Sequence, residues 1–441
     1  MLAHHLLQRL ERIDPVKLYG RVLRAVGLTI EGTGPASSIG QLCRIVPAHH
    51  PEPIEAEVVG FRDGRVLLMP LGDVRGIGPG SHVIYDAQMP MVPVGPELLG
   101  RVLDGLGRPL DGREPIPASA AYPLYHDPPN PLERERIACP LDVGIRAINA
   151  LLTCGRGQKV GIFAGSGVGK SVLLGMMCRQ TEADVTVIAL IGERGREVKE
   201  FIEKELGPTG RQRAVVVAAT SDQPPLVRLR GAFLATAIAE YFRDQGRHVL
   251  LLMDSLTRVA HAQREVGLAV GEPPTSKGYP PSVFALLPKI LERVAPTPQG
   301  TMTGLYTVLV EGDDLADPIA DFVRAVLDGH IVLTRELAAR GHFPAIDVLK
   351  SISRVMPDIV SRDHLAHARF LLELLAVYQN AEDLINLGAY RPGSNARLDL
   401  AVSMIETIQQ FLRQDVREQA PLADSVRALE AIVYQARERI A

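Results

Sequence analysis

The sequence predicts an α/β chain in which a parallel sheet follows a small β-barrel and precedes a helical segment. Short β-like runs cut by glycines fill about residues 16–95, apolar runs alternate with helical stretches over about 140–345, and helical periodicity alone continues afterwards. Closely spaced strands with glycine turns are typical of small barrels. Apolar strands that alternate with helices are typical of a parallel sheet covered on both faces. At 441 residues the chain is too long for one compact core, so we expect several domains.

The composition is that of an ordinary globular protein. Apolar residues make up 46% of the chain, charged residues make up 22%, and the formal net charge is −3, which gives no reason to expect nucleic acid as a partner. The sequence has no run of about 18 uncharged apolar residues and no basic-then-apolar start typical of a secretory signal. Its four cysteines lack the spacing of metal ligands, so we expect reduced, mostly buried thiols in a cytosolic protein.

Residues 1–15 predict a short amphipathic helix. Four apolar residues fall on one stripe, polar residues fill the rest, and a proline at position 15 ends the pattern. So short a helix is marginal alone and needs a surface to lie on. That surface is the body of the chain itself, a partner protein or an anionic lipid surface.

The barrel is predicted over residues 16–95. Asp63-Gly64 lies between alternating segments, which is a hairpin signal. A proline-rich stretch over residues 113–136 is a poor helix or strand but a good connector.

The parallel sheet is predicted from five apolar runs that read "KVGIFA", "VTVIALIG", "RAVVVAAT", "HVLLLMDS" and "GLYTVLVEG". After about residue 346 we expect no further strands and a bundle of helices. The expected domains are an amphipathic helix over 1–15, a barrel over 16–95, a nucleotide-binding α/β domain over 96–345 and a helical domain over 346–441.

Residues 161–174 read "GIFAGSGVGKSVLL" and predict a nucleotide-phosphate loop. An apolar strand leads into a glycine-rich turn and then a helix, which is the context that this motif requires. Backbone N–H groups of the turn and the helix N-terminus bind phosphate oxygens. Lys170 supplies a positive charge to the outer phosphates, and the Ser171 hydroxyl is a Mg²⁺ ligand. The expected nucleotide-binding residues are Gly165, Ser166, Gly167, Val168, Gly169, Lys170, Ser171 and Val172.

Ala164 stands where the usual pattern has its first glycine. An alanine is tolerated there if the residue keeps strand backbone angles, because only positive-φ positions require glycine. The alternative, a glycine-rich turn without a ligand, is disfavoured by the intact Gly-Lys-Ser and its flanks.

Two carboxylates follow apolar runs of the predicted sheet. Asp254 ends "HVLLLMDS" and is expected to hold Mg²⁺, the alternative being a helix N-cap. Glu193 follows "VIALIG" and can polarise the water that attacks a γ-phosphate. The alternative for Glu193 is a solvated charge in a charged turn.

Four longer segments read "GIFAGSGVGKSVLLGMM", "ADVTVIALIGERGREVKEFIE", "LLLMDSLTRVAHAQREVGLAVGEPPTSKGYPPSVFALLPKILER" and "FPAIDVLKSISRVMPDI". They resemble the flagellar type III protein-export ATPases, which are related to the catalytic β subunit of rotary F-type ATP synthases and to injectisome secretion ATPases. The resemblance covers essentially the whole chain, and "GSGVGKS" and "EPPTSKGYPPSVFALLP" favour the flagellar branch. It implies a RecA-like nucleotide-binding core between an N-terminal barrel and a helical C-terminal domain.

The resemblance also implies roles for single residues. Lys170 and Ser171 bind phosphate and magnesium, Glu193 activates the attacking water and Asp254 completes the Mg²⁺ shell. Members of this branch commonly carry alanine at the position of Ala164, so the loop is expected to bind ATP.

Four further residues are assigned only through the resemblance. Arg194 and Arg258 match positions that face the γ-phosphate. Arg354 matches an arginine finger that enters a neighbouring subunit's site, where such a cation can speed the reaction by ~10³-fold or more. Phe343 matches an aromatic residue that stacks on adenine.

The partners that the resemblance implies are those of an export machine. They are a homohexameric ring of this chain, a regulatory protein on the first helix, a central stalk protein, export chaperones with their substrates, and an export gate at the membrane. The expected location is the cytoplasm, peripheral at the cytoplasmic face of the inner membrane.

Three alternatives remain open at this point. An injectisome ATPase differs in partners rather than in chemistry. An RNA-dependent ring helicase or terminator would need an aromatic and basic single-strand surface in the barrel, where aromatics are few and tryptophan is absent. A catalytically silent ring subunit would lack the carboxylate of Glu193.

Overall fold

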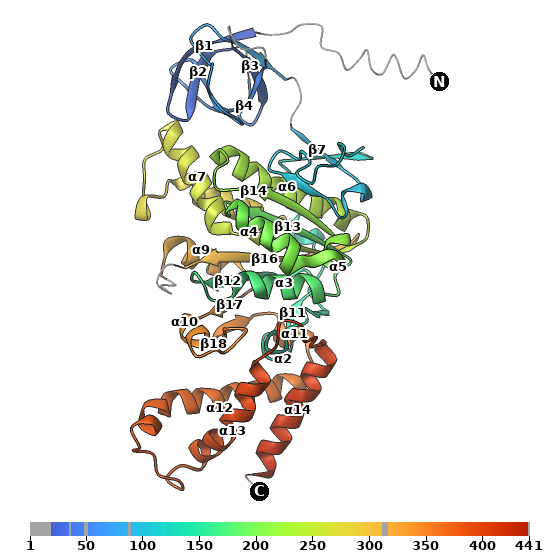
Figure 1. Cartoon of the computed structure of the whole chain (residues 1–441), viewed down its shortest axis with the longest axis vertical. Helices are drawn as coiled ribbons and strands as arrows, with labels where there is room; N and C mark the ends of the chain where they lie inside the picture. The colour runs from blue at the N-terminus through green and yellow to red at the C-terminus, as the bar shows by residue number, and fades with distance from the viewer. Residues whose placement is uncertain are drawn as a thin grey trace, which may run out of the picture.

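The computed structural model describes residues 19–34, 37–47, 52–86, 90–117, 119–310 and 316–439. The molecule is elongated, with a barrel at one end, a sheet flanked by helices in the middle and a group of helices at the other end (Figure 1). The helix predicted over residues 1–15 lies outside the described residues.

The N-terminal barrel is closed, with strand order β1-β2-β5-β4-β3-β6. A two-residue turn joins β4 to β5, with φ of 49° at Asp63 and 72° at Gly64. Two consecutive positive φ angles are the geometry of a type I′ hairpin turn, so the predicted hairpin is confirmed. The barrel strands are β1 (Tyr19–Val26), β2 (Thr29–Thr33), β3 (Leu42–Val46), β4 (Ile54–Arg62), β5 (Arg65–Pro70) and β6 (His82–Tyr85).

The central sheet has eight strands in the order β18-β17-β12-β16-β15-β13-β14-β8. All neighbours pair in parallel except β17 and β18. The five predicted apolar runs form strands in its middle. The strands are β8 (Val102–Asp104), β12 (Lys159–Ala164), β13 (Val185–Ile191), β14 (Ala214–Ala219), β15 (His248–Asp254), β16 (Thr301–Leu309), β17 (Gly329–Leu333) and β18 (Ile346–Ser353).

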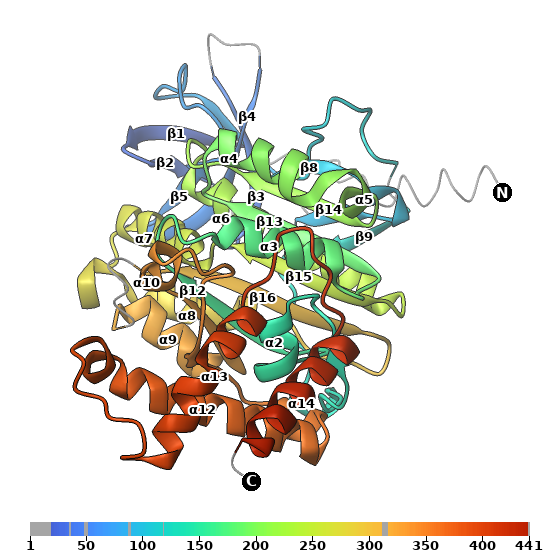
Figure 2. The ribbon, with the colours of Figure 1, turned by 60° about the horizontal axis from the view of Figure 1, so that its bottom comes forward.

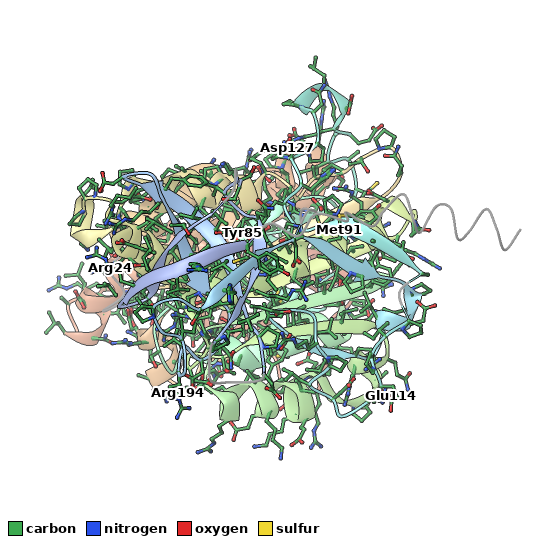
Figure 3. All side chains as sticks on the ribbon, turned by 90° about the horizontal axis from the view of Figure 1, so that it is seen from above. Arg24, Tyr85, Met91, Glu114, Asp127 and Arg194 are labelled. Carbon is green, nitrogen blue, oxygen red and sulfur yellow. The ribbon has the colours of Figure 1, made fainter. Side chains whose placement is uncertain are left out.

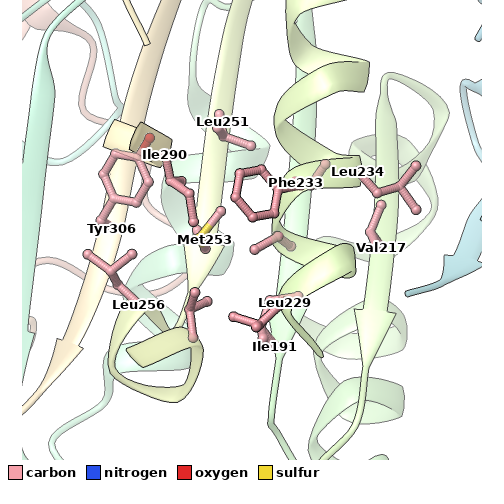
Figure 4. Close-up of a cluster of buried hydrophobic side chains, with 14 of the residues drawn as sticks. Ile191, Val217, Leu229, Phe233, Leu234, Leu251, Met253, Leu256, Ile290 and Tyr306 are labelled. Carbon is pink, nitrogen blue, oxygen red and sulfur yellow. The ribbon is translucent and has the colours of Figure 1, made fainter. Parts of the chain in front are cut away.

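Helices cover both faces of the sheet, and each face has its own hydrophobic core (Figure 2). In the larger core, Phe233 of α6 packs among Leu251 and Met253 of β15 (Figure 4). One face carries α6 (Pro225–Asp244), α7 (Leu256–Val270), α8 (Pro281–Leu291) and α9 (Pro318–Val326), and the other carries α2 (Arg146–Leu151) and α3 (Lys170–Gln180). This burial on both faces explains why the central strands are almost continuously apolar.

Two predictions about the strands are wrong. β18 lies beyond residue 346 and forms the antiparallel edge of the sheet, so the strands do not stop there. Its burial alternates along the strand, because an edge strand is covered less than the central ones, and its sequence therefore lacks a continuous apolar run. The proline-rich connector is also not wholly irregular, since β9 (Ala120–Pro123) pairs with β7 (Met91–Val94) outside the barrel.

The C-terminal helices pack below the sheet against α2 and share its hydrophobic core (Figure 1). They are α12 (Arg362–Asn386), α13 (Ala396–Leu412) and α14 (Leu422–Glu438), as the helical periodicity predicted. Other short helices are α4 (Gly195–Glu200), a π-helix (Phe201–Leu206), α5 (Gly207–Gln212), α10 (Arg335–Ala339) and α11 (Met356–Ile359). None of the described helices is long and apolar enough to span a bilayer.

Candidate active site

The phosphate loop connects the end of β12 to the start of α3. Ala164 is the last residue of β12, pairs with Leu309 and Leu333 on its two neighbours and is buried. It therefore keeps strand geometry, as its tolerance in place of glycine requires. Positive φ angles occur at Gly167 (79°) and Gly169 (85°), where an L side chain would be strained.

The loop borders a cavity of about 1030 Å³. Lys170, at the first turn of α3, is the loop's cation in this cavity. Val168 is the exception among the eight predicted loop residues, because its side chain is buried in the core and only its backbone belongs to the loop. The predicted loop residues that line the cavity are Gly165, Ser166, Gly167, Gly169, Lys170, Ser171 and Val172.

Asp254 ends β15 beside the loop and is buried. Its Oδ1 atom lies 2.5 Å from Nζ of Lys170 and accepts a hydrogen bond from the Thr307 hydroxyl at 2.6 Å. Ser255, not Asp254, caps α7, since the Ser255 side chain accepts from the N–H of Arg258. The N-cap alternative for Asp254 is thereby excluded, and its carboxylate faces the loop lysine.

Glu193 follows β13 through Gly192, whose φ is 72°. A Cβ at Gly192 would lie 2.8 Å from Cβ of Arg258, so only glycine fits this approach. The Glu193 Oε1 atom lies 3.8 Å from Nζ of Lys170 and is buried. This turn therefore brings the carboxylate into the cavity beside the loop, and the solvated-charge alternative does not hold.

Burial, together with the negative charge of Asp254, raises the pKa of Glu193 to about 7 despite the opposing charge of Lys170. A hydrogen bond with Glu197 acts in the same direction on the pKa of Glu193. A carboxyl group with a pKa near neutrality is suited to accept a proton from water.

The two predicted γ-phosphate arginines both line the cavity. Arg194 projects from the rim of the molecule (Figure 3), with 83% of its side chain exposed, and forms an ion pair with Glu197 at 3.6 Å. Arg258 is half-buried at the start of α7.

Arg354 lies elsewhere. It follows β18, is exposed and does not line the cavity of its own chain. Its backbone N–H donates to the carbonyl of Asp328 at 3.0 Å, and the Asp328 carboxylate accepts from the N–H of Lys159 at 3.0 Å. Arg354 is therefore held at the N-terminal end of β12, opposite to the end that carries the loop.

Phe343 lies over the phosphate loop without lining the cavity. A Cβ at Gly169 would be 3.6 Å from the Phe343 ring, and this side chain is exposed on its other side, with 46% of the residue accessible. Its carbonyl accepts from the N–H of Gln414, which ties it to the helical domain. A half-exposed ring beside the loop is placed to stack on a base.

Known proteins that are similar in sequence to this chain are named as ATP synthases, which agrees with a phosphate loop beside two buried carboxylates. Over 98% of its length the chain is 54% identical to the flagellum-specific ATP synthase of Bacillus subtilis (strain 168), 99% of which is covered. The chain belongs to the flagellum-specific ATP synthase family. Its relative in Salmonella typhimurium is 54% identical over 95% of this chain and 94% of that protein. This family member is an ATP-hydrolysing enzyme, and the flagellar assignment is supported over the alternatives.

Two domain families and a solved structure extend the match. Residues 144–353 match the ATP synthase alpha/beta family, nucleotide-binding domain, and residues 360–431 match the T3SS EscN ATPase C-terminal domain. The assembled ATPase EscN from the enteropathogenic E. coli type III secretion system superposes with a TM-score of 0.90 at 46% identity. The alignment covers 94% of this chain and all of that one. The predicted fold of barrel, RecA-like core and helical C-terminal domain is confirmed.

Several cavity residues of this family member were missed by sequence reasoning. His261, whose Nε2 lies 3.0 Å from the Tyr279 hydroxyl, belongs to a stripe on α7 that begins at Arg258 and continues to Arg264. That three-residue spacing, directly after Asp254, is a signal that could have revealed the stripe. The other missed lining residues are Gly192, Glu197, Ser221, Thr257, Lys277, Tyr279, Leu309, Val310, Asp317 and Arg335.

The oxygen atoms around the loop fit Mg²⁺ that arrives with a nucleotide. Ser171 and Asp254 offer a hydroxyl and a carboxylate, which are hard ligands. Across the described ranges, no three or more His, Cys, Asp or Glu side chains gather where they could hold a metal. Mg²⁺ is commonly bound through one or two protein ligands plus substrate phosphates, and this donor set matches that mode.

Proposed function

We propose that this chain is the ATP-hydrolysing motor of a flagellar type III export apparatus, working as a homohexameric ring with Mg²⁺ and ATP. The observation that carries the ring is the position of Arg354, outside the cavity of its own chain. A cation at that position completes a reaction centre only when a second copy lies alongside. The relative EscN forms an assembled ATPase, which supports the same arrangement.

The chemistry follows from the side chains around the loop. Lys170 and the loop N–H groups hold the phosphates. Ser171 and Asp254 hold Mg²⁺, which neutralises charge on the phosphate oxygens when bound. Glu193 accepts the proton of the attacking water, because its pKa of about 7 allows it to ionise near neutral pH.

Arg194 and Arg258 face the γ-phosphate from the same chain, and Arg354 of a neighbour stabilises the charge of the transition state. Phe343 stacks on the adenine ring.

The partners that we propose are those of the export machine. EscN has been solved in complex with its central stalk EscO, and a stalk protein is proposed here on that basis. A regulatory protein on the first helix, export chaperones with their substrates, and an export gate complete the set. The proposed location is the cytoplasm, at the inner membrane face. We place the domain boundaries near residue 15, between β6 and β7 because β7 lies outside the barrel, and near residue 354 because β18 belongs to the sheet.

The test is the ATPase rate per chain measured against protein concentration. If sites form between subunits, the specific activity rises with assembly, and Arg354→Ala abolishes that rise while nucleotide binding persists. Arg427→Ala, which removes an exposed arginine on α14, is the matched control and should leave the curve unchanged. A constant rate down to concentrations where the chain is monomeric would contradict the shared site.

The flagellar role is tested separately by complementation. A strain without its own flagellar export ATPase should regain motility with this chain and not with its Glu193→Gln variant. Restored injectisome secretion without motility would favour the injectisome alternative.

A further inference from the structure

We propose that Thr307 is a positioning residue that fixes the Asp254 carboxylate for Mg²⁺, and this inference rests on the proposed metal role of Asp254. Thr307 lies on β16, the strand between the one that leads into the phosphate loop and the one that ends at Asp254. β16 pairs with β12, which leads into the phosphate loop, and with β15, which ends at Asp254. Of the strands in the described sheet, β16 is the one that contacts both.

The register of β16 places Thr307 at the level of Asp254. Tyr306 pairs with Met253, so the next residue on each strand is Thr307 and Asp254. Thr307 also pairs with Ile162 on β12, two residues before the last residue of that strand. The side chain of Thr307 is fully buried and thus exchanges no hydrogen bond with bulk water.

The hydroxyl proton of Thr307 goes to Asp254. The distance to Oδ1 of Asp254 is 2.6 Å, whereas the carbonyl of Met253 is 3.5 Å away. A hydroxyl has one proton to donate, and an O–H to carboxylate bond of this length is charge-assisted. The Thr307 hydroxyl therefore donates to the Asp254 carboxylate rather than to the Met253 carbonyl, and so helps to orient that carboxylate.

Thr307 and Lys170 both donate to the same oxygen, Oδ1. No hydrogen bond to Oδ2 of Asp254 comes from any residue that the structure describes. When nucleotide binds, the Lys170 ammonium serves the phosphates. Thr307 then remains as the side-chain donor that keeps Oδ1 occupied and Oδ2 available.

Thr307 orients Asp254, the proposed Mg²⁺ ligand, and does not itself contact the nucleotide. Groups that orient a metal ligand typically change metal affinity by about 10–100-fold when they are removed. Thr307→Val keeps the side-chain shape and removes the hydroxyl. The expected result is a Mg²⁺ requirement about tenfold higher, with little change in Mg²⁺-free nucleotide binding.

The experiment is a Mg²⁺ titration of a fluorescent ADP analogue bound to the full chain, with ADP affinity in EDTA measured alongside. The absence of tryptophan from the sequence keeps background emission low. We expect Thr307→Val to raise the Mg²⁺ midpoint about tenfold and Thr307→Ser to restore it. Thr236→Val, another fully buried threonine, whose hydroxyl donates within α6, is the matched control. Thermal unfolding in EDTA reports folding of each variant.

A second pair keeps the test valid if the valine variant does not fold. Thr307→Ser and Thr307→Ala both lack the γ-methyl group and differ only by the hydroxyl, so only the alanine variant should require more Mg²⁺. An unchanged Mg²⁺ midpoint in Thr307→Val, an equal fall in EDTA affinity, or equal midpoints in the serine and alanine variants would overturn the inference.

Asp254→Asn separates this inference from the proposed metal site. If Asp254→Asn loses the Mg²⁺ response and Thr307→Val keeps it, Thr307 has no positioning role but the metal site stands. If Asp254→Asn keeps the full response, the metal assignment itself is wrong, and the inference about Thr307 falls with it.

Discussion

The Lys170 ammonium lies 2.5 Å from the Asp254 carboxylate, and both side chains are largely shielded from water. The pair neutralises two charges that would otherwise be costly to bury. In the proposed function Lys170 binds the ATP phosphates instead, so the ion pair and the nucleotide compete for the same ammonium group.

Replacing Lys170 should therefore destabilise the empty chain as well as abolish nucleotide binding. Lys170→Met leaves the Asp254 charge unpaired, and we expect the free energy of unfolding to fall by ~3 kcal/mol. Adding Asp254→Asn should recover part of that loss, because the buried charge is then removed. Urea unfolding in EDTA measures the free energy of unfolding of the single and double variants. If the two single changes simply add in the double variant, the two side chains are not energetically coupled.

Glu193→Gln should stop turnover without preventing ATP binding. The amide keeps the shape of the side chain but cannot accept a proton, and a general base is worth about 10²–10⁴-fold in rate. Steady-state ATPase assays and nucleotide titration check the two parts. Glu200→Gln, which alters a carboxylate of α4 outside the cavity, is the control. Persistent turnover in Glu193→Gln would mean that another group activates the water.

The raised pKa of Glu193 predicts how stability depends on pH. The folded chain holds a proton up to about pH 7, whereas the unfolded chain releases it near the ordinary value of 4.5. The folded state then binds more protons across this window, so this group lowers stability as pH rises through it. Glu193→Gln removes that loss. The nucleotide-free variant should match the parent near pH 4.5 and exceed it at pH 8 by up to about 3 kcal/mol.

Urea unfolding of both chains in EDTA at several pH values measures this difference. The same ionisation predicts that kcat/KM falls below about pH 7, because it reports the free enzyme's base. A stability difference independent of pH would show that Glu193 is ionised normally in the empty site.

Phe343 should affect nucleotide affinity more than the rate of the chemical step. Stacking of an aromatic ring on a base is worth about 1–3 kcal/mol, so Phe343→Leu should raise KM for ATP roughly tenfold and change kcat little. Phe343→Tyr, which keeps the ring, should bind ATP like the parent. An unchanged KM in the leucine variant would place adenine elsewhere.

The sequence could predict the site residues whose role is visible in a single continuous segment of the chain. The loop, Asp254 and Glu193 each adjoin an apolar strand, and parallel strands bring their carboxyl ends to one edge of a sheet. Thr307 could not be found this way, because it lies within a strand and acts through its position between two others. Arg354 and Phe343 were assigned through family resemblance alone, since a lone arginine or phenylalanine carries no local signal.

The fold shows the same division. Central strands covered on both faces have an unmistakable apolar run, whereas β18 at the edge alternates and escaped prediction. The hairpin at Asp63-Gly64 was predictable because its turn depends on two adjacent residues.

Strand β12 connects the phosphate loop at one end to the residues that hold Arg354 at the other. Its last residue leads into the phosphate loop. Its first residue, Lys159, donates its N–H to the Asp328 carboxylate, and the Asp328 carbonyl accepts from the N–H of Arg354. Six extended residues span roughly 20 Å and barely stretch. If such chains form a ring, a displacement of the phosphate loop on nucleotide binding would be transmitted through β12 to Arg354 of the same chain, which serves the neighbouring site. We therefore expect neighbouring sites to hydrolyse ATP one after another rather than simultaneously.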